Sequence, residues 1–123
     1  MTDKTDPDNQ FHVMLMDELG PSIEDLFQEC NKKLDIPSVC QIAVKLLKRV
    51  EAIHSVGIIH RDLKPGNFLV GTSESTKNNI YVIDFGLSKY YRDSKGRHIP
   101  EKTNKAVTGT PRYASLRTML GHE

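Results

Sequence analysis

The clearest pattern in the chain is one apolar stripe between residues 38 and 57. Apolar residues recur there at intervals of three and four, as they do on one face of an α-helix. The stripe consists of Val39, Ile42, Ala43, Leu46, Leu47, Val50 and Ile53. Pro37 and Ser38, with Gln41 three residues later, mark the start of the helix, and Gly57 marks its end. The pattern therefore predicts a long core helix.

Two shorter elements precede this helix. The apolar run Phe11–Met16 is flanked by polar residues, which indicates a buried strand. Ser22, followed by Asp25 three residues later, resembles a capping box, and apolar residues continue at helical spacing behind it. We therefore expect a short helix from Ser22 to about Lys33.

Downstream of the long helix, the pattern changes to that of short strands. Residues 67–70 and 80–83 are β-prone and flank a polar stretch, which predicts a hairpin with a long loop. Residues 88–111 form a polar, basic segment with little periodicity. Loops of that length in compact domains are usually functional or disordered, so this segment is expected to be one or the other.

The composition is that of an ordinary globular domain. Hydrophobic residues make up 37% of the 123 residues and charged residues 27%, values that suggest neither a fibrous nor a disordered chain. No apolar run approaches the roughly 20 residues of a membrane helix, and the N-terminus lacks the apolar region of a secretory signal. We therefore expect no membrane span and a location in the cytosol or the nucleus. Cys30 and Cys40 fit no metal-binding pattern and are expected to be free, partly buried thiols.

Charge is distributed unevenly along the chain. The net charge is only +1, yet residues 1–35 carry nine acidic and three basic side chains, and residues 84–117 carry three acidic and eight basic ones. The second region is a candidate surface for anions. Nucleic acid is an unlikely partner for it, because the basic residues lack interleaved aromatic residues beyond Tyr90 and Tyr91.

The motif with the most chemical content is HRDLKPGN, residues 60–67. Phosphoryl transfer needs a group that orients the attacking hydroxyl, a cation near the transferred phosphate, and ligands for Mg²⁺. Asp62 and Lys64 can fill the first two roles, and Asn67 can offer an amide oxygen to a metal. Asp84, in the DFG motif 17 residues after Asn67, would be the charged metal ligand. The two motifs in this order predict a phosphate-handling site.

The same motifs resemble the catalytic and metal-binding loops of the eukaryotic protein kinases. Lys64 and Pro65 after the aspartate are of the serine/threonine type. Three stretches, LGPSIEDLF, HIPEKTNK and TGTPRYASL, resemble the casein kinase 1 family in particular. The stretch EAIHSVG is also similar to the related tau tubulin kinases, which leaves the subfamily open.

The resemblance covers residues 11–123 and leaves residues 1–10 as a polar leader that is expected to be disordered. It implies an α+β fold that is part of a protein kinase domain. The parts present would be the hinge strand, the front helices of the C-lobe, the catalytic loop, the DFG hairpin and the activation segment.

The resemblance implies that ATP and Mg²⁺ are the cofactors, and it assigns roles to particular residues. Asn67 and Asp84 would hold the metal, and Thr110 would hydrogen-bond to Asp62 and Lys64. The nucleotide would be contacted by Met16 as gatekeeper, by the backbone from Asp17 to Leu19, by Ser22 and Asp25 near the ribose, and by Leu69 and Ile83. Hydrophobic core positions for Met16, Leu69 and Ile83, and a helix-capping role for Asp25, remain open alternatives.

The implied function is ATP-dependent phosphorylation of serine or threonine in proteins. Substrates with acidic or phosphorylated residues are expected, because the resemblance places Arg112, with Lys105 and Lys102 around it, in a pocket for such groups. The alternative is an inactive kinase fragment that acts as a binding module.

The sequence also departs from the family pattern. The usual glycine-rich loop, strand lysine and helix glutamate are not found before Phe11, and the sequence stops soon after the docking segment. We therefore expect most of the upper lobe and part of the lower lobe to be missing and this chain to be inactive alone. Gly66 takes a position that is commonly acidic, which loosens the loop before Asn67. Arg117 stands where the family has Asn, and no partner for it is evident in the sequence.

Overall fold

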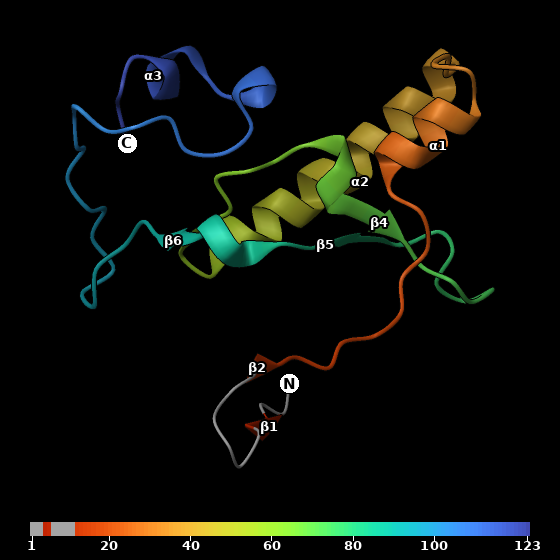
Figure 1. Ribbon diagram of the computed structural model, residues 1–123, viewed down its shortest axis with the longest axis horizontal. Helices are drawn as coiled ribbons and strands as arrows, with labels where there is room; N and C mark the ends of the chain where they lie inside the picture. Colours follow the sequence, from red (N-terminus) through yellow and green to blue (C-terminus); the bar gives the residue numbers. More distant parts are fainter. Residues whose placement is uncertain (1–3, 6–11) are drawn as a thin grey trace.

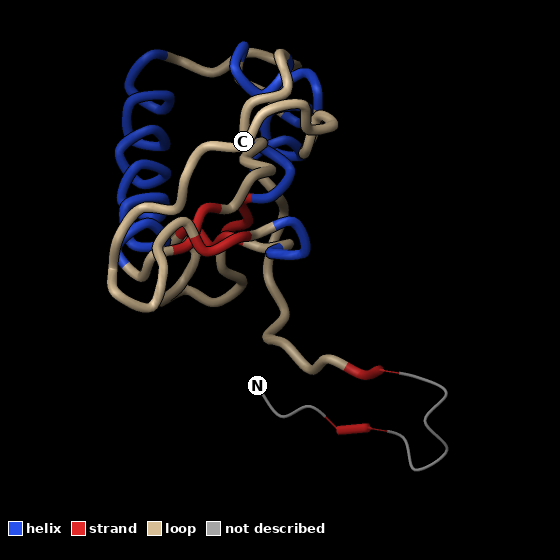
Figure 2. Tube along the Cα trace, turned by 90° about the vertical axis from the view of Figure 1, so that its left-hand side faces the viewer, coloured by secondary structure: helices blue, strands red, loops and turns tan. Residues whose placement is uncertain are grey.

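The structure is a computed structural model that describes residues 4–5 and 12–123. Its helices are α1 (Ile23–Glu29), α2 (Ile36–Ser55) and α3 (Leu116–Met119), and its strands are β1 (Lys4–Thr5), β2 (His12–Val13), β3 (Ile58–Ile59), β4 (Phe68–Val70), β5 (Ile80–Val82) and β6 (Lys89–Tyr90). The strands form the antiparallel pairs β1–β2, β3–β6 and β4–β5. Figures 1 and 2 show β1 and β2 away from the rest of the chain. The mixture of helices and small sheets fits the predicted α+β class.

The core lies where α1 and α2 meet the β4–β5 hairpin (Figure 1). Ile23, Phe68 and Ile80 are buried, and partly buried side chains of α1, α2 and the hairpin pack against them. Arg49 of α2 donates a hydrogen bond from Nε to the carbonyl oxygen of Ile80, at 2.7 Å. The hairpin is thereby fixed on α2, and the loop before β4 and the turn after β5, which lie at the same end of the hairpin, carry the predicted catalytic residues.

The predicted long helix is confirmed as α2, with two corrections. Its N-cap is Asp35, whose carboxylate accepts a hydrogen bond from the backbone N–H of Ser38, so Ser38 is inside the helix. Gly57 follows the helix with a φ of 80°, as a helix-terminating glycine does. The stripe is only half covered: no residue of α2 is buried, and Val39 and Leu47 are 47% and 69% exposed. Periodicity identified the apolar face, but it did not show how much of that face is covered.

The buried strand predicted over Phe11–Met16 is wrong for the residues that the structure describes. Phe11 lies outside them, β2 ends at Val13, and Met14 and Met16 are 66% and 58% exposed. The physical reason is the strand's partner: β2 pairs with the two-residue β1, which covers neither face. Of the predicted leader, only residues 4–5 are described, and they form β1.

The short helix predicted from Ser22 begins as expected and ends early. Ser22 is the N-cap of α1, and the helix stops at Glu29, before the predicted end near Lys33. Asn31 and Lys32 have φ values of 53° and 59°, which lie in the left-handed region and cannot continue an α-helix.

The predicted hairpin is confirmed as β4–β5, whereas the pairing of β3 with β6 was not predicted. Residues 88–111 contain β6 and a bridge between Arg92 and His98, but little other regular structure. Cys30 and Cys40 are free, as expected, but they are exposed and not partly buried: Cys30 is the C-cap of α1, and Cys40 lies near the start of α2, of which no residue is buried. Among the described residues, no helix has the length and apolar character needed to cross a bilayer.

Candidate active site

The loop between β3 and β4 carries the HRDLKPGN motif and is held in place by the side chain of His60. The imidazole is 2% exposed. Its Nε2–H donates to the carbonyl oxygen of Ile83, at 2.9 Å, and its Nδ1 accepts from the backbone N–H of Asp62, at 3.3 Å. The ring also meets that of Phe85 edge-on, with 5.0 Å between centroids. His60 is therefore a packed histidine that joins the HRD and DFG motifs.

The carboxylate of Asp62 lies at the centre of a polar cluster. The residue is 7% exposed. Its Oδ1 accepts a hydrogen bond from the backbone N–H of Thr110, at 2.7 Å, and its Oδ2 lies 2.9 Å from Nζ of Lys64. Lys64 Nζ also donates to Oγ1 of Thr110, at 3.2 Å. Residues that are 48 positions apart in the sequence thus meet around one carboxylate.

The contacts of Asp62 determine its charge state. The hydrogen bond from Lys64, followed by that from the Thr110 side chain, lowers the pKa of Asp62 from 3.8 to about 2. In return, Asp62 raises the pKa of Lys64, mainly through the same hydrogen bond. Near pH 7 the site therefore presents a fixed anion beside a fixed cation. That arrangement can orient a hydroxyl group and balance charge on a phosphoryl group.

Asn67 and Asp84 are the candidate metal ligands. The Asn67 amide is 5% exposed, and its Nδ2 donates to the backbone carbonyl of Asp62, at 2.9 Å, and to Oδ2 of that residue, at 3.3 Å. Both contacts use the nitrogen, which leaves the amide oxygen available as a ligand. Asp84 is exposed, and its charge helps to raise the pKa of Lys64, so it faces the same site.

This set of donors fits Mg²⁺. One amide oxygen and one carboxylate are hard ligands of the kind that Mg²⁺ uses together with substrate phosphates. Within residues 4–5 and 12–123, no group of three or more His, Cys, Asp or Glu side chains could hold a metal ion. The two oxygen donors of Asn67 and Asp84 would hold such a cation together with water or substrate phosphates.

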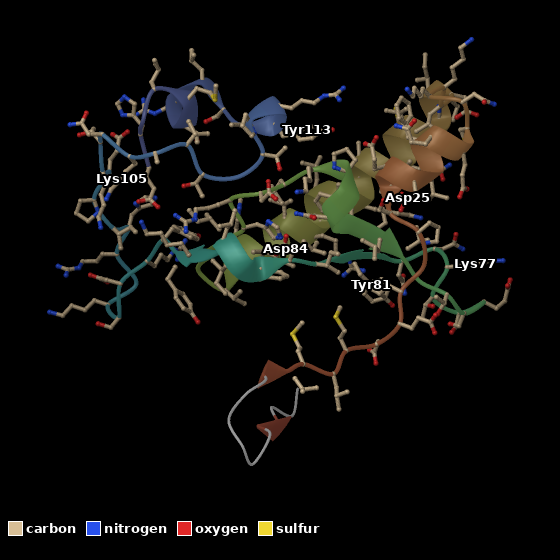
Figure 3. The ribbon with its side chains drawn as sticks, viewed as in Figure 1. Asp25, Lys77, Tyr81, Asp84, Lys105 and Tyr113 are labelled. Carbon is tan, nitrogen blue, oxygen red and sulfur yellow. The ribbon has the colours of Figure 1, made fainter. Side chains whose placement is uncertain are left out.

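The backbone of Asp84 is held in an unusual conformation. Its φ and ψ are 62° and 66°, in the left-handed region, and a short 3₁₀ helix over Phe85–Leu87 follows. Asp is one of the few residues that visit this region. Figure 3 shows Asp84 near the centre of the molecule, below the segment that carries Tyr113. The turn places the Asp84 carboxylate where the hairpin ends.

Gly109 allows the activation segment to approach the catalytic loop. Its φ is 88°, and a Cβ at this position would lie 2.3 Å from the carbonyl oxygen of Arg61. Only glycine fits this combination of dihedral angle and close backbone approach. The contact brings the next residue, Thr110, to Asp62.

Two of the predicted nucleotide-binding residues, Ser22 and Asp25, cap the N-terminus of α1 in the structure. Ser22 and Asp25 form a reciprocal capping box: the N–H and Oγ of Ser22 donate to Oδ2 of Asp25, at 2.9 and 2.6 Å, and the N–H of Asp25 donates to Oγ of Ser22, at 3.1 Å. The helix-capping alternative for Asp25 is therefore present in the structure, and the hydrogen bonds from Ser22 lower the pKa of Asp25.

The remaining nucleotide candidates lie on the hairpin and on the exposed N-terminal segment. Leu69 on β4 forms a bridge with Ser22 and is partly buried, as is Ile83 just after β5. Leu19 is also partly buried, whereas Met16 and Asp17 are exposed. The structure thus brings Leu69 next to the capping box and leaves the gatekeeper candidate uncovered.

The predicted substrate cations do not form one pocket. Arg112 is exposed on a 3₁₀ helix, with its guanidinium 5.8 Å from the ring centroid of Tyr113, and it lines a cavity of about 340 Å³ against α1. Lys105 lines a different cavity, of about 210 Å³, together with Arg61. Lys102 is exposed, and its backbone pairs with Glu123. Arg112 is thus separate from the two lysines.

Two ionic clusters near the C-terminal end were not predicted. The side chain of Glu123 pairs with Arg61 and Lys89. Glu101 pairs with Arg117, so the expectation that Arg117 has no partner is wrong, and Glu101 also lies 2.9 Å from Nδ1 of His122. The sequence shows that these side chains carry opposite charges, but its spacing does not show which of them meet.

Comparison with known families agrees with this geometry. Residues 5–120 match the family model described as protein kinase domain. The match includes the HRDLKPGN and DFG motifs and the segment that carries Thr110, whose backbone N–H donates to Asp62 in the structure. This chain belongs to the protein kinase domain family.

Proposed function

We propose that the chain carries the catalytic loop of an ATP-dependent protein kinase that phosphorylates serine or threonine. The observation that carries this proposal is the buried carboxylate of Asp62, held by Lys64 and by the backbone of Thr110. A hydroxyl-orienting anion next to a phosphate-binding cation is the arrangement that phosphoryl transfer needs.

Each residue has a specific task in this proposal. Asp62 accepts a hydrogen bond from the substrate hydroxyl and directs it toward the phosphorus, which is the main requirement because the transition state is loose. Lys64 balances charge on the transferred group. Asn67 and Asp84 would hold Mg²⁺, which when bound neutralises charge on the nucleotide phosphates.

The choice of serine or threonine and of acidic substrates rests on fewer residues. Lys64 and Pro65 match the serine/threonine type of catalytic loop. Arg112 is exposed and lines a cavity that also includes Pro65 of that loop, so an acidic or phosphorylated substrate residue can reach its guanidinium. We include a casein kinase 1-like preference for acidic or primed substrates in the proposal on this basis.

The 123 residues alone are expected to show little kinase activity. They contain no glycine before Gly20, so a glycine-rich loop ahead of the hinge segment, which would position the nucleotide phosphates, is not among them. Positioning supplies most of the catalysis in this reaction. Phosphorylation of casein by the purified chain with Mg²⁺ and ATP, abolished by Asp62→Ala, would contradict this expectation.

The proposed function is tested in a kinase chimera. Residues 17–123 of this chain replace the matching segment of an active serine/threonine kinase, which supplies the phosphate-positioning loop, the lysine and the remaining helices. We expect the chimera to phosphorylate a protein substrate and to lose that activity on Asp62→Asn. Glu74→Gln, which changes an exposed residue on the hairpin loop, is the matched control and should retain activity.

A folded chimera that binds ATP but transfers no phosphate would reject the proposal. It would favour the second candidate, an inactive kinase segment that acts as a binding module. The observation in favour of that candidate is the part of the apolar face of α2 that remains uncovered, where Val39 and Leu47 are exposed.

A further inference from the structure

A cavity of about 340 Å³, called the α1 cavity below, lies between α1 and two segments that meet at Asp62. Its apolar and aromatic lining residues are Ile23, Phe27, Leu34, Pro65 and Tyr113. Its polar lining residues are Glu24, Gln28, Lys32 and Arg112. Apolar walls with a few polar groups are typical of ligand sites, whose volumes are roughly 300–1,000 Å³. The α1 cavity is near the lower end of that range, which suits a single large side chain.

The walls of the α1 cavity are held in place by the fold. Ile23 is only 8% exposed and belongs to the hydrophobic core. The turn after α1, which leads to Leu34, is closed by a hydrogen bond from the N–H of Lys32 to the carbonyl oxygen of Phe27, at 2.9 Å. A pocket whose walls are already in place loses little conformational entropy when a ligand binds.

The α1 cavity borders the candidate active site on two sides. Pro65 directly follows Lys64, whose Nζ lies 2.9 Å from Oδ2 of Asp62. The N–H of Tyr113 donates to the carbonyl oxygen of Thr110, at 2.9 Å, and Thr110 donates its own N–H to Asp62. Asp62 is the main cause that raises the pKa of Lys64, and Tyr113 adds a smaller contribution, so the phenol lies near the ammonium group. A polypeptide that presents a hydroxyl group to Asp62 can therefore reach this cavity with a nearby side chain.

The residues at the edge of the α1 cavity suit an acidic polypeptide. The guanidinium of Arg112 is exposed and lies 5.8 Å from the ring centroid of Tyr113. Gly66 follows Pro65, and a Cβ at this position would meet nothing within 4 Å apart from its chain neighbours. The glycine thus leaves space beside Pro65 and adds no acidic group. An acidic or phosphorylated residue at Arg112 and an apolar residue in the cavity are therefore compatible neighbours.

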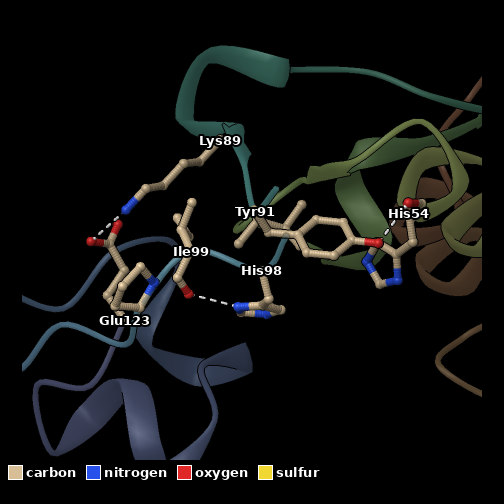
Figure 4. Close-up of a pocket in the computed structure, with 8 residues that line it drawn as sticks. His54, Lys89, Tyr91, His98, Ile99 and Glu123 are labelled. Carbon is tan, nitrogen blue, oxygen red and sulfur yellow. Dashed lines mark hydrogen bonds and ion pairs between the residues drawn. The ribbon is translucent and has the colours of Figure 1, made fainter. Parts of the chain in front are cut away.

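The cavity beside β6, which Figure 4 shows, has different surroundings. Its volume is about 280 Å³, and its lining residues include none of residues 60–67. In its wall, the hydroxyl of Tyr91 donates to the carbonyl oxygen of His54, at 2.9 Å, and Nζ of Lys89 lies 2.8 Å from Oε2 of Glu123. These polar groups already have partners within the chain. Of the two cavities, the α1 cavity is the one that borders the catalytic loop.

We propose that the α1 cavity is a substrate subsite, which accepts one large apolar side chain, such as that of Leu, Met or Phe, close to the acidic or phosphorylated residue that Arg112 contacts. Burial of such a side chain removes apolar surface from water, and it should favour leucine over alanine by about tenfold. The inference rests on the proposed function for its consequence in catalysis, whereas peptide binding itself requires no phosphoryl transfer.

The preference is measured in the kinase chimera with a leucine scan. Each peptide contains one target serine and one phosphoserine at a fixed spacing, and a single leucine replaces alanine at one position after another. Leucine at one position, or at two neighbouring positions, should lower the KM about tenfold relative to the alanine peptide. A flat KM profile in an active chimera would overturn the proposal, because no subsite would then distinguish the apolar side chain.

Phe27→Ala tests whether the α1 cavity is the origin of the preference. The variant should remove most of the leucine preference and change the KM for the alanine peptide by less than about twofold. Val44→Ala, which shortens an exposed apolar side chain of α2 outside the cavity, is the matched control and should keep the preference. A leucine preference that persists in Phe27→Ala would overturn the proposal. If Phe27→Ala does not fold, Leu34→Ala shortens a second wall residue. The same loss is then expected, and its absence would overturn the proposal.

Peptide binding to the 123-residue chain separates this inference from the proposed function. An inactive parent chimera would reject the proposed function, and the binding result would then decide on the α1 cavity alone. In NMR titrations with the same peptides, at least one leucine peptide should bind about tenfold more tightly than the alanine peptide. It should shift the amide signals of Phe27 and Leu34, but not those of His98 and Ile99 beside the other cavity. Equal binding of all peptides, or shifts confined to His98 and Ile99, would overturn the proposal.

Discussion

The depressed pKa of Asp62 predicts a specific dependence of stability on pH. The pKa falls from 3.8 to about 2 in the folded chain, which corresponds to about 2 kcal/mol of stabilisation at neutral pH, at about 1.4 kcal/mol per tenfold change in proton affinity. For a carboxyl group with a lowered pKa, this contribution is complete above the unfolded value and is lost as pH falls toward the folded one. By pH 3, about half of it should be gone.

Asp62→Asn isolates this contribution, because the amide has nearly the same shape and does not titrate in this range. The free energy of unfolding of the parent and of the variant is measured by urea denaturation between pH 7 and pH 3. The stability advantage of the parent should narrow by about 1 kcal/mol over that range. Other carboxylates with lowered pKa values, such as Asp25 and Asp35, titrate equally in both proteins and cancel in the difference.

If the difference in the free energy of unfolding between the parent and Asp62→Asn stays constant from pH 7 to pH 3, the reasoning is refuted. A direct check follows the carboxyl carbon of Asp62 by NMR, where Lys64→Met should move the pKa back toward 3.8, because the hydrogen bond from Lys64 is the first cause of the shift. If Asp62 titrates near 2, it is fully ionised throughout the pH range in which kinases are assayed. The acidic limb of a rate profile in the kinase chimera must then come from another group.

In the kinase chimera, Asp84→Asn should lower kcat on the order of 100-fold at saturating Mg²⁺, and Asn67→Ala less, because the charged ligand carries more of the field; equal rates for the Asp84 variant and the parent would show a wrong assignment. In the 123-residue chain, Gly109→Ala should lower the free energy of unfolding by about 2 kcal/mol more than Gly96→Ala. Both glycines have a positive φ, but only a Cβ at Gly109 meets a backbone oxygen, at 2.3 Å, so equal losses in urea denaturation would contradict the close approach. Arg112→Ala should raise the KM of the chimera for a phosphoserine-primed peptide about tenfold and that for an unprimed peptide much less; an equal effect on both would leave Arg112 as a surface charge.

Local signals in the sequence were sufficient for the elements that frame the site. Apolar spacing predicted α2, the pair Ser22 and Asp25 predicted the capping box, and two β-prone runs predicted the β4–β5 hairpin. Each of these features is determined by residues close together in the chain or by one continuous period. The order of the HRD and DFG motifs then indicated which loops would carry chemistry.

Features that depend on distant residues could not be predicted in the same way. The pairing of β3 with β6 joins two-residue strands that have no alternating pattern. The ion pair between Glu101 and Arg117 and the contacts of Glu123 with Arg61 and Lys89 depend on how the basic segment folds back. The buried strand predicted over Phe11–Met16 is wrong for the same reason. Apolar character shows that a segment can be buried, but not which element covers it.

His60 connects the HRDLKPGN and DFG motifs by hydrogen bonds, without a chemical role of its own in the proposed reaction. Its Nε2 donates to the carbonyl oxygen of Ile83, directly before Asp84, and its Nδ1 accepts from the backbone N–H of Asp62. This arrangement requires the neutral tautomer with the proton on Nε2. Both ring nitrogens are therefore in use, and none remains to take a proton from a substrate. The distance between the hydroxyl-orienting carboxylate and the candidate metal ligand thus depends on a side chain that takes no part in the proposed reaction.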